Sequence, residues 1–237
     1  MMRTRINMVA VMMLGALMLF AATGRAHAFR NVKKVSAIEF KGLKYLTKYE
    51  LISAADTVVE QDGIVIDVDS LEAALRKNLY VKDYRIVEKD RRITVTVEEK
   101  RPALVMAIEK EGAYAFIELD GELAALSYNR VHAADRPLVV VPWAFAHSGS
   151  LSKQVRDYLR TILEAEKSGL KVCRELTEVY IRSDGKVRIR LRGRRTEFLA
   201  EMNRAALERL NTCVGFLDAA GRYPAHMNIF DTFGVMK

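Results

Sequence analysis

The sequence predicts an α+β protein: an N-terminal signal-anchor helix, then a small β-α-α-β-β unit, then a larger mixed β unit with two helices. Three observations predict it. Half of the 237 residues are hydrophobic and 29% are charged, which is the balance of a packed protein. Apolar residues alternate with period two in several short segments, as in strands. Helix-capping signals and helical spacing separate those segments. The length suits two domains of about 100 residues each.

The N-terminus predicts export. Residues 8–24 carry no charge, and Arg3 and Arg5 precede them. A run of about 15 apolar residues makes roughly 23 Å of helix, against a hydrocarbon core of about 30 Å. Two alternatives stay open. The segment is a signal peptide cleaved after Ala28, which ends a small-x-small site, or it is a transmembrane anchor with residues 1–7 as a cytoplasmic tail.

The first folded unit is predicted over residues 32–101. Val35–Gly42 alternates, with apolar side chains on one face, and predicts a strand that ends at a glycine. Thr47 and Glu50 have the spacing of a capping box, in which each side chain satisfies an end N–H of the helix that follows.

A second helix and a strand pair complete this unit. Asp69, with Glu72 three residues later, predicts the start of the second helix, which carries leucines at helical spacing through Leu79. Tyr84–Glu88 and Arg92–Glu98 are predicted as strands around a polar turn, because the second alternates between apolar and polar residues.

The second unit is predicted over residues 102–237. Its expected strands are Leu104–Ile108, Tyr114–Leu119, Glu122–Leu126, Pro137–Pro142, Leu176–Arg182, Lys186–Arg192, Met227–Phe230 and Phe233–Met236. Its expected helices run from Leu151 to Gly169, with the N-cap in Ser148–Ser150, and over Thr196–Thr212.

This order of elements resembles the bacterial cell-division protein family FtsQ/DivIB, over nearly the whole chain. The first unit is similar to a POTRA domain in its entry strand, Val35-x-x-Ile38-x-Phe40-x-Gly42, and in its exit strand from Ile93 to Pro102. Phe116–Leu123 is similar to the hairpin of the family, and Pro137–Pro142 stands where the family has a Leu-Pro strand. At Ile229–Phe233 the chain lacks the arginine that the family usually has there.

The resemblance implies a non-enzymatic bitopic scaffold of cell division. Its bulk would lie in the periplasm and its single span in the inner membrane. It would bind the small division proteins FtsB and FtsL, with FtsW and the septal transpeptidase nearby, and recruit the machinery that makes septal peptidoglycan. The competing interpretation is a POTRA-bearing periplasmic helper of outer-membrane protein assembly or secretion, a class that normally carries a long C-terminal barrel.

No motif in the sequence predicts catalysis, so we expect a protein that is not an enzyme and has no cofactor or metal. The four histidines include no pair at metal-ligand spacing. The two cysteines, Cys173 and Cys213, form no Cys-x-x-Cys motif. They are interpreted as two small buried hydrophobic residues, with a disulfide as the alternative in an oxidising compartment.

Charge points to one candidate binding face. The net charge of +8 favours anionic partners, although such an excess is also common without one. Lys186, Arg188, Arg190 and Arg192 alternate with aliphatic residues, so they would share one face of a strand. That face either docks an acidic partner or is simply solvated. Nucleic acid is not expected, because no aromatic residues interleave with the arginines.

The C-terminal segment is the second candidate. Ile229, Phe230, Phe233 and Val235 belong to a dense apolar set near residue 237. Chain ends fray unless they are tied down, so these residues predict a partner-binding edge. The alternative is that they complete the sheet of their own domain.

Overall fold

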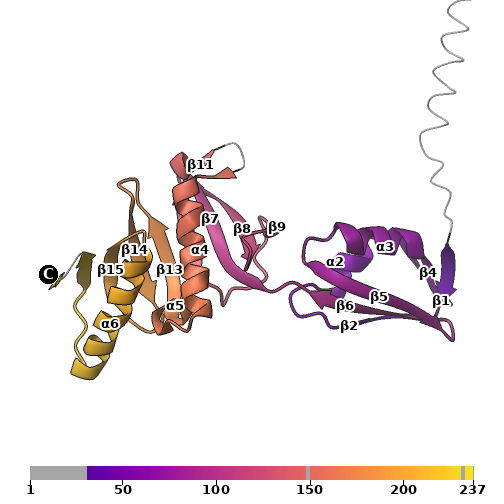
Figure 1. Cartoon of the computed structure of the whole chain (residues 1–237). Helices are drawn as coiled ribbons and strands as arrows, with labels where there is room; N and C mark the ends of the chain where they lie inside the picture. The colour runs from indigo at the N-terminus through magenta and orange to yellow at the C-terminus, as the bar shows by residue number, and fades with distance from the viewer. Residues whose placement is uncertain (1–30, 148–149, 231–232, 237) are drawn as a thin grey trace, which may run out of the picture.

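The computed structural model describes residues 31–147, 150–230 and 233–236. Within them the chain is an α+β protein with five α-helices and four sheets. Figure 1 shows two lobes joined end to end where β7 begins, and each lobe has its own hydrophobic core. The predicted anchor at 8–24, its tail at 1–7 and the cleavage position after Ala28 lie outside the described residues. None of the described helices combines the length and the hydropathy that crossing a membrane requires.

The smaller lobe contains two three-stranded sheets and two helices. One sheet has the order β2-β6-β5, with β2 parallel to β6 and β5 antiparallel to it. The other has the order β1-β4-β3 and is antiparallel. The elements are β1 (Val32–Val35), β2 (Ala37–Lys41), α2 (Lys48–Ser53), β3 (Thr57–Glu60), β4 (Gly63–Asp67), α3 (Val68–Lys77), β5 (Val81–Lys89) and β6 (Arg92–Glu99).

The predicted β-α-α-β-β order is present as β2, α2, α3, β5 and β6, but three further strands accompany it. The single strand expected over Val35–Gly42 is two strands, because the chain changes sheets at Ser36. The N–H and the Oγ of Ser36 both donate to the carbonyl of Arg91, at 2.7 and 3.0 Å. Gly42 ends the second strand at a φ of 85°, where an added Cβ would lie 2.2 Å from the carbonyl oxygen of Val97.

One of the two predicted helix starts is confirmed. The Oγ1 of Thr47 accepts from the N–H of Glu50 at 3.3 Å, and the N–H of Thr47 donates to the Glu50 carboxylate at 2.8 Å. The second helix begins earlier than predicted, because Asp67 is its N-cap and accepts from the N–H of Asp69 at 3.0 Å. Leu79 lies beyond the end of that helix and is 43% exposed.

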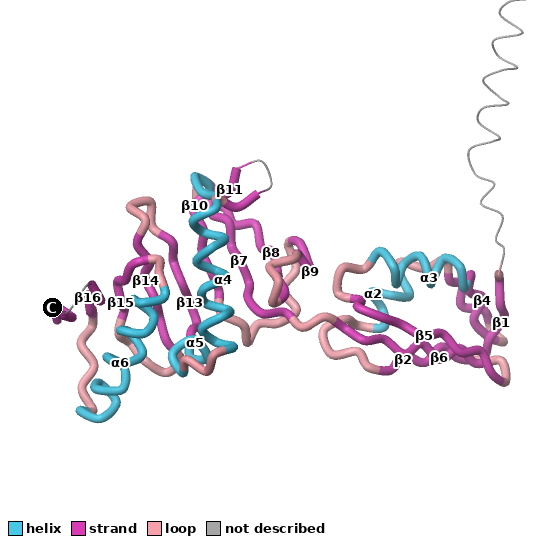
Figure 2. Tube along the Cα trace, viewed as in Figure 1, coloured by secondary structure: helices cyan, strands magenta, loops and turns pink. Residues whose placement is uncertain are grey.

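The larger lobe is built on a nine-stranded mixed sheet with the order β17-β16-β15-β14-β13-β10-β7-β8-β9 (Figure 2). β10 is parallel to both of its neighbours and β16 is parallel to β15; the other pairs are antiparallel. The elements are β7 (Pro102–Lys110), β8 (Ala113–Asp120), β9 (Ala125–Tyr128), β10 (Leu138–Pro142), β11 (Ala146–His147), β12 (Ser150–Leu151), α4 (Lys153–Lys167), α5 (Lys171–Glu175), β13 (Leu176–Ile181), β14 (Lys186–Leu191), β15 (Glu197–Glu201), α6 (Arg204–Ala220), β16 (His226–Phe230) and β17 (Phe233–Met236).

The helices α4, α5 and α6 lie on one face of this sheet and leave the other face open (Figure 1). Alternate strand residues such as Val179, Ile189 and Phe198 are fully buried beneath the helices. Burial of this apolar area is the main source of the stability of the lobe, at roughly 25 cal/mol per Å². The alternation predicted for β14 is confirmed.

Both helix predictions in this lobe are wrong at their starts, and the second is also wrong at its end, because α6 continues to Ala220. Of the helix expected over Thr196–Thr212, the first part is strand β15, in which Phe198 and Ala200 alternate into the core. The helix starts after Asn203, whose side chain caps Ala206 N at 2.8 Å. The N-cap of α4 is Ser152.

Two further differences concern the residues before α4 and the number of helices. Ser150 belongs to strand β12, and Ser148 and Gly149 lie outside the described residues, so the N-cap predicted in Ser148–Ser150 is not at Ser150. The lobe also has three α-helices rather than the two expected, because α5 was not foreseen.

Both cysteines are free thiols, and the first interpretation, two small buried residues, holds for Cys173. Cys173 on α5 is buried, and burial raises the pKa of its thiol to about 11. Cys213 on α6 is half-buried.

Candidate protein-binding surfaces

Two of the predicted arginines lie on the open face of the sheet and are paired there. Arg190 on β14 stands between β13 and β15, with its guanidinium 3.1 Å from the Glu178 carboxylate and 3.3 Å from that of Glu197. The guanidinium of Arg188 lies over the ring of Tyr180, at 4.5 Å from its centroid, and 3.9 Å from Glu197. These cross-strand contacts compensate part of the charge that the sequence pattern suggested.

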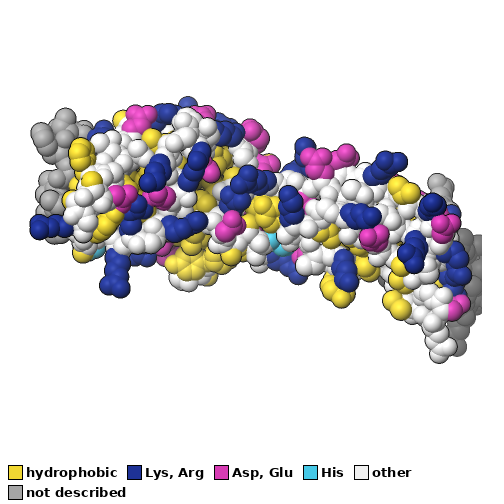
Figure 3. Space-filling model, turned by 90° about the horizontal axis from the view of Figure 1, so that it is seen from below, with side chains coloured by type: hydrophobic (Ala, Val, Ile, Leu, Met, Phe, Trp, Pro, Cys, Tyr) yellow, Lys and Arg dark blue, Asp and Glu magenta, His cyan; other side chains and the backbone are white. Residues whose placement is uncertain are grey.

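The other two cations of the pattern have different positions. Lys186 lies above the ring of Phe230, with its Nζ 4.6 Å from the ring centroid. Arg192 is past the end of β14, in a turn, and its Nη2 lies 3.5 Å from the carbonyl oxygen of Asp135. The prediction that four cations share one strand face therefore holds for three. Figure 3 shows basic and acidic side chains interspersed on the face that it displays.

The C-terminal candidates divide between core and surface. Ile229 is 2% exposed and packs in the larger core, so its side chain has no surface to offer to a partner. This corrects the prediction that Ile229 contacts a partner, and the reason is the alternation of β16. Phe230 is half-buried on the opposite face.

The last strand, β17, stands at the edge of the sheet. It pairs antiparallel with β16, with Phe233 opposite Phe230 and Val235 opposite Asn228. Within the described residues β17 has β16 as its one neighbour. The side chains of Phe233 and Val235 lie outside what the structure describes. A strand in this position has one row of backbone N–H and C=O groups to pair with another chain.

A buried carboxylate joins the two lobes. Glu118 on β8 has no exposed surface. One of its oxygens accepts from the backbone N–H groups of His132 and Ala133, at 2.7 and 2.8 Å. The other accepts from the hydroxyl of Tyr80 at 2.5 Å and lies 2.8 Å from Nδ1 of His132. Because Tyr80 belongs to the smaller core, this carboxylate ties the two lobes together.

The network continues into the first helix. Nε2 of His132 lies 3.2 Å from the carboxylate of Glu50, and the guanidinium of Arg130 lies 2.7 Å from the same oxygen. The ring of Tyr80 meets His132 edge-on, with centroids 5.0 Å apart. Burial and the neighbouring Glu118 raise the pKa of Tyr80, so its hydroxyl remains a donor.

Apolar packing reinforces the same junction. Leu126 on β9 is 3% exposed and packs in the smaller core, although it belongs to the larger sheet. The separation of residues 32–101 from 102–237 as independent domains therefore stays a prediction, since the smaller core includes a side chain from beyond residue 101.

The residues of this junction were not among the sequence candidates. Tyr80, Glu118 and His132 are far apart in the chain, and no spacing rule connects them. The one local signal was Glu118, a carboxylate between the apolar Ile117 and Leu119 of a predicted strand. A charge at such a position must find partners when it is buried.

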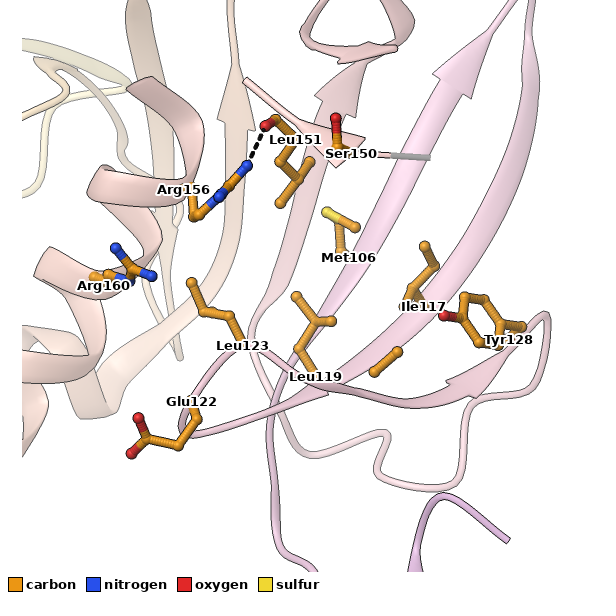
Figure 4. Close-up of a pocket in the computed structure, with 11 residues that line it drawn as sticks. Met106, Ile117, Leu119, Glu122, Leu123, Tyr128, Ser150, Leu151, Arg156 and Arg160 are labelled. Atoms are coloured by element: carbon orange, nitrogen blue, oxygen red, sulfur yellow. Dashed lines mark hydrogen bonds between the residues drawn. The ribbon is translucent and has the colours of Figure 1, made fainter. Parts of the chain in front are cut away.

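A groove of about 440 Å³ runs between α4 and the strands β7 to β9. In Figure 4, Met106, Ile117 and Leu119 lie along its floor, and Arg156 and Arg160 extend from α4 at its side. Tyr128, which is 61% exposed, is on the far rim.

Among the described residues no group of three or more His, Cys, Asp or Glu side chains could hold a metal ion. His132 lies between the two lobes, with the carboxylates of Glu118 and Glu50 on either side of its ring.

A search finds no protein-family model that matches the chain and no curated protein that matches it.

Proposed function

We propose that this chain is a non-enzymatic scaffold of bacterial cell division, of the FtsQ/DivIB kind. In this proposal residues 8–24 anchor it in the inner membrane, and residues 32–101 form a POTRA-like domain in the periplasm. Residues 102–237 form the β domain. The chain binds FtsB and FtsL, with FtsW and the septal transpeptidase nearby, and so recruits septal peptidoglycan synthesis.

The observation that carries the proposal is the order of two sheets along the chain, a small one followed by a large one. The mixed sheet β2-β6-β5, with α2 and α3 against it, has the element order that the resemblance implies for a POTRA domain. It is followed by a large sheet with helices on one face and with the last strand of the chain, β17, at its edge. Such a fold offers surfaces and edges to other proteins.

The binding mode we propose is strand addition at β17. A partner strand would pair with the outer backbone groups of Phe233–Met236 and extend the nine-stranded sheet by one strand. The main-chain hydrogen bonds would supply affinity, and side chains next to the edge, such as Phe230, would supply selectivity.

Co-purification tests this function. The full chain would be co-expressed with FtsB and FtsL from the same bacterium, and the complex would be isolated through a tag on the chain. We expect both partners to be retained, and we expect a chain that ends at residue 232 to lose them. A matched control carries Val58→Ser and Val59→Ser on the exposed strand β3, far from β17. It should retain both partners.

Depletion of the protein in the cell gives the independent test. Filaments without septa support the proposal. Normal septa together with loss of outer-membrane proteins would instead identify a POTRA-bearing helper of outer-membrane protein assembly, the competing interpretation.

A further inference from the structure

The two basic surfaces of the larger lobe differ in how their charge is compensated. On the open face, three cations (Lys186, Arg188 and Arg190) stand beside two carboxylates on the flanking strands. Those carboxylates are Glu178 and Glu197, whereas the carboxylate of Glu201, opposite Lys186, lies 3.4 Å from Arg209 on α6. Arg190 contacts both Glu178 and Glu197, at 3.1 and 3.3 Å. An acidic partner that docked there would have to displace carboxylates already in place.

The groove beside α4 has a larger excess of positive charge. Three adjoining hollows line the sheet side of this helix and share residues with one another, Arg160 and Glu122 at one end and Leu163 and Lys167 at the other. Six basic and three acidic side chains line them. The basic ones are Arg101, Arg136, Arg156, Arg160, Lys167 and Arg174, and the acidic ones are Glu122, Glu164 and Glu166.

The two arginines over the largest hollow are weakly engaged. The guanidinium of Arg156 donates to the carbonyl of Leu151 at 2.9 Å, which satisfies one N–H but offsets no charge. Arg160 lies 3.8 Å from Asp157 on its own helix, with 57% of its side chain exposed. The two are one helical turn apart, so both guanidinium groups can reach one ligand.

The floor beneath these arginines is apolar. The half-buried Ile117 on β8, Leu123 and Leu151 give it accessible apolar surface, and the buried Met106 and Leu119 close it from beneath (Figure 4). Arg156 and Lys167 are separated by 11 helical positions, or about 17 Å, which is the length of about five residues of extended chain.

We propose that this groove binds an acidic, extended segment of a partner protein. One or two large apolar side chains of the segment rest against Ile117, Leu123 and Leu151, and neighbouring carboxylates pair with Arg156 and Arg160. Charge complementarity carries this assignment, because the six cations that line the groove exceed its carboxylates by three, whereas the three cations of the β14 face exceed the two carboxylates beside them by one. The site lies beside β8 and β9, at the opposite edge of the sheet from β17.

The test uses the full chain and a synthetic probe. A fluorescein-labelled peptide of alternating Leu and Glu would be titrated with the protein and followed by fluorescence anisotropy. We expect binding that weakens with salt, and a loss of about tenfold or more in the R156E/R160E variant. The matched control, K89E/R195E, makes the same change in net charge at exposed residues outside the groove. It should bind as the unmodified chain does.

Two further probes separate the alternatives. A peptide with Ser in place of Leu should bind at least about tenfold more weakly, since the apolar floor then contributes nothing. Equal binding would reduce the site to a general electrostatic attraction and overturn the proposal. The other alternative is that the chain binds phosphatidylglycerol vesicles. If R156E/R160E loses that binding and K89E/R195E keeps it, the groove faces lipid, and the proposal of a protein partner is overturned.

A measurement on the unmodified chain tests the proposal even if the variants fail to fold. Hydrogen exchange with and without the Leu-Glu peptide should show added protection in β8 and at the start of α4. Protection confined to β16 and β17 would place the peptide elsewhere and contradict the proposal.

Peptide binding in the groove requires only that the chain binds a protein partner. It can therefore stand if the division role fails, and co-purification with FtsB and FtsL can succeed if the groove binds no peptide.

Discussion

The junction between the lobes and the open face of β14 are made from the same kinds of side chain, yet they differ in exposure. Glu118 in the junction has no exposed surface, and four contacts surround its two oxygens. On the open face the side chains of Arg190 and Glu178 are 55% and 33% exposed. A buried charge that loses its partners stays uncompensated, whereas an exposed one regains water.

The comparison distinguishes a junction that stabilises the fold from a surface that is exposed to solvent. The junction has its partners within the chain and is expected to matter for stability. The open face is partly compensated and solvated, so substitutions there are expected to change stability little. Four predictions test this difference.

Removal of the Glu118 carboxylate has the largest expected effect. Glu118→Ala leaves two backbone N–H groups and the Tyr80 hydroxyl without their acceptor, and should cost about 3–5 kcal/mol of unfolding free energy. Urea unfolding measures it. Glu118→Gln keeps one acceptor oxygen and should cost less. Glu122→Ala, at an exposed turn of the same hairpin, is the control and should stay within about 0.5 kcal/mol. Equal costs for Glu118→Ala and Glu122→Ala would mean that the junction is not a stabilising element.

Adjacent residues on β16 give the second prediction. Ile229→Ala opens a cavity in the larger core and should cost about 2–4 kcal/mol, while Phe230→Ala on the open face should cost less than about 1 kcal/mol. Thermal or urea unfolding of both variants measures the difference. A larger cost for Phe230→Ala would show that the alternation of β16 is reversed.

Acid should weaken the junction by less than removal of the carboxylate, because a protonated Glu118 still accepts hydrogen bonds. Burial acts to raise its pKa, but hydrogen bonds from Tyr80, His132 and Ala133 outweigh this and hold the pKa below 4.5. Glu50, which faces His132 and Arg130, also has a lowered pKa: burial acts to raise it, and hydrogen bonds from Thr47 and His132 outweigh that.

The sign follows from these directions. A carboxylate with a folded-state pKa below its unfolded value stabilises the fold above the unfolded value, and that contribution is lost as the pH falls through the folded one. Unfolding free energy, measured from pH 7 down to pH 3, should therefore fall below pH 4.5. The fall should be shallower in Glu118→Gln. An equally steep fall in that variant would assign the acid sensitivity to other groups.

The smallest effect is expected on the open face. Arg190→Ala should cost less than about 1 kcal/mol, because both of its carboxylate contacts are partly exposed. A double-mutant cycle with Glu197→Ala should give a coupling of about 0.2–1 kcal/mol, which high salt reduces. A coupling near that of a buried pair would contradict the contrast between the two regions.

By itself the sequence determined the features that depend on near neighbours. The Thr47–Glu50 capping box and the alternation of β14 were both predicted correctly. Each rests on hydrogen bonds within a few residues or on a simple period, so the local chain carries the whole signal.

Only the tertiary structure decided the rest. Residues 197–201 fit a helical spacing, yet β14 and β16 on either side make them a strand. The pairing of Arg190 with Glu178 and the meeting of Glu118 with Tyr80 and His132 also depend on which strands lie side by side. The physical reason is that the contribution of a polar side chain to stability depends on its burial and on its partners across the sheet. Neither can be inferred from the residues next to it in the sequence.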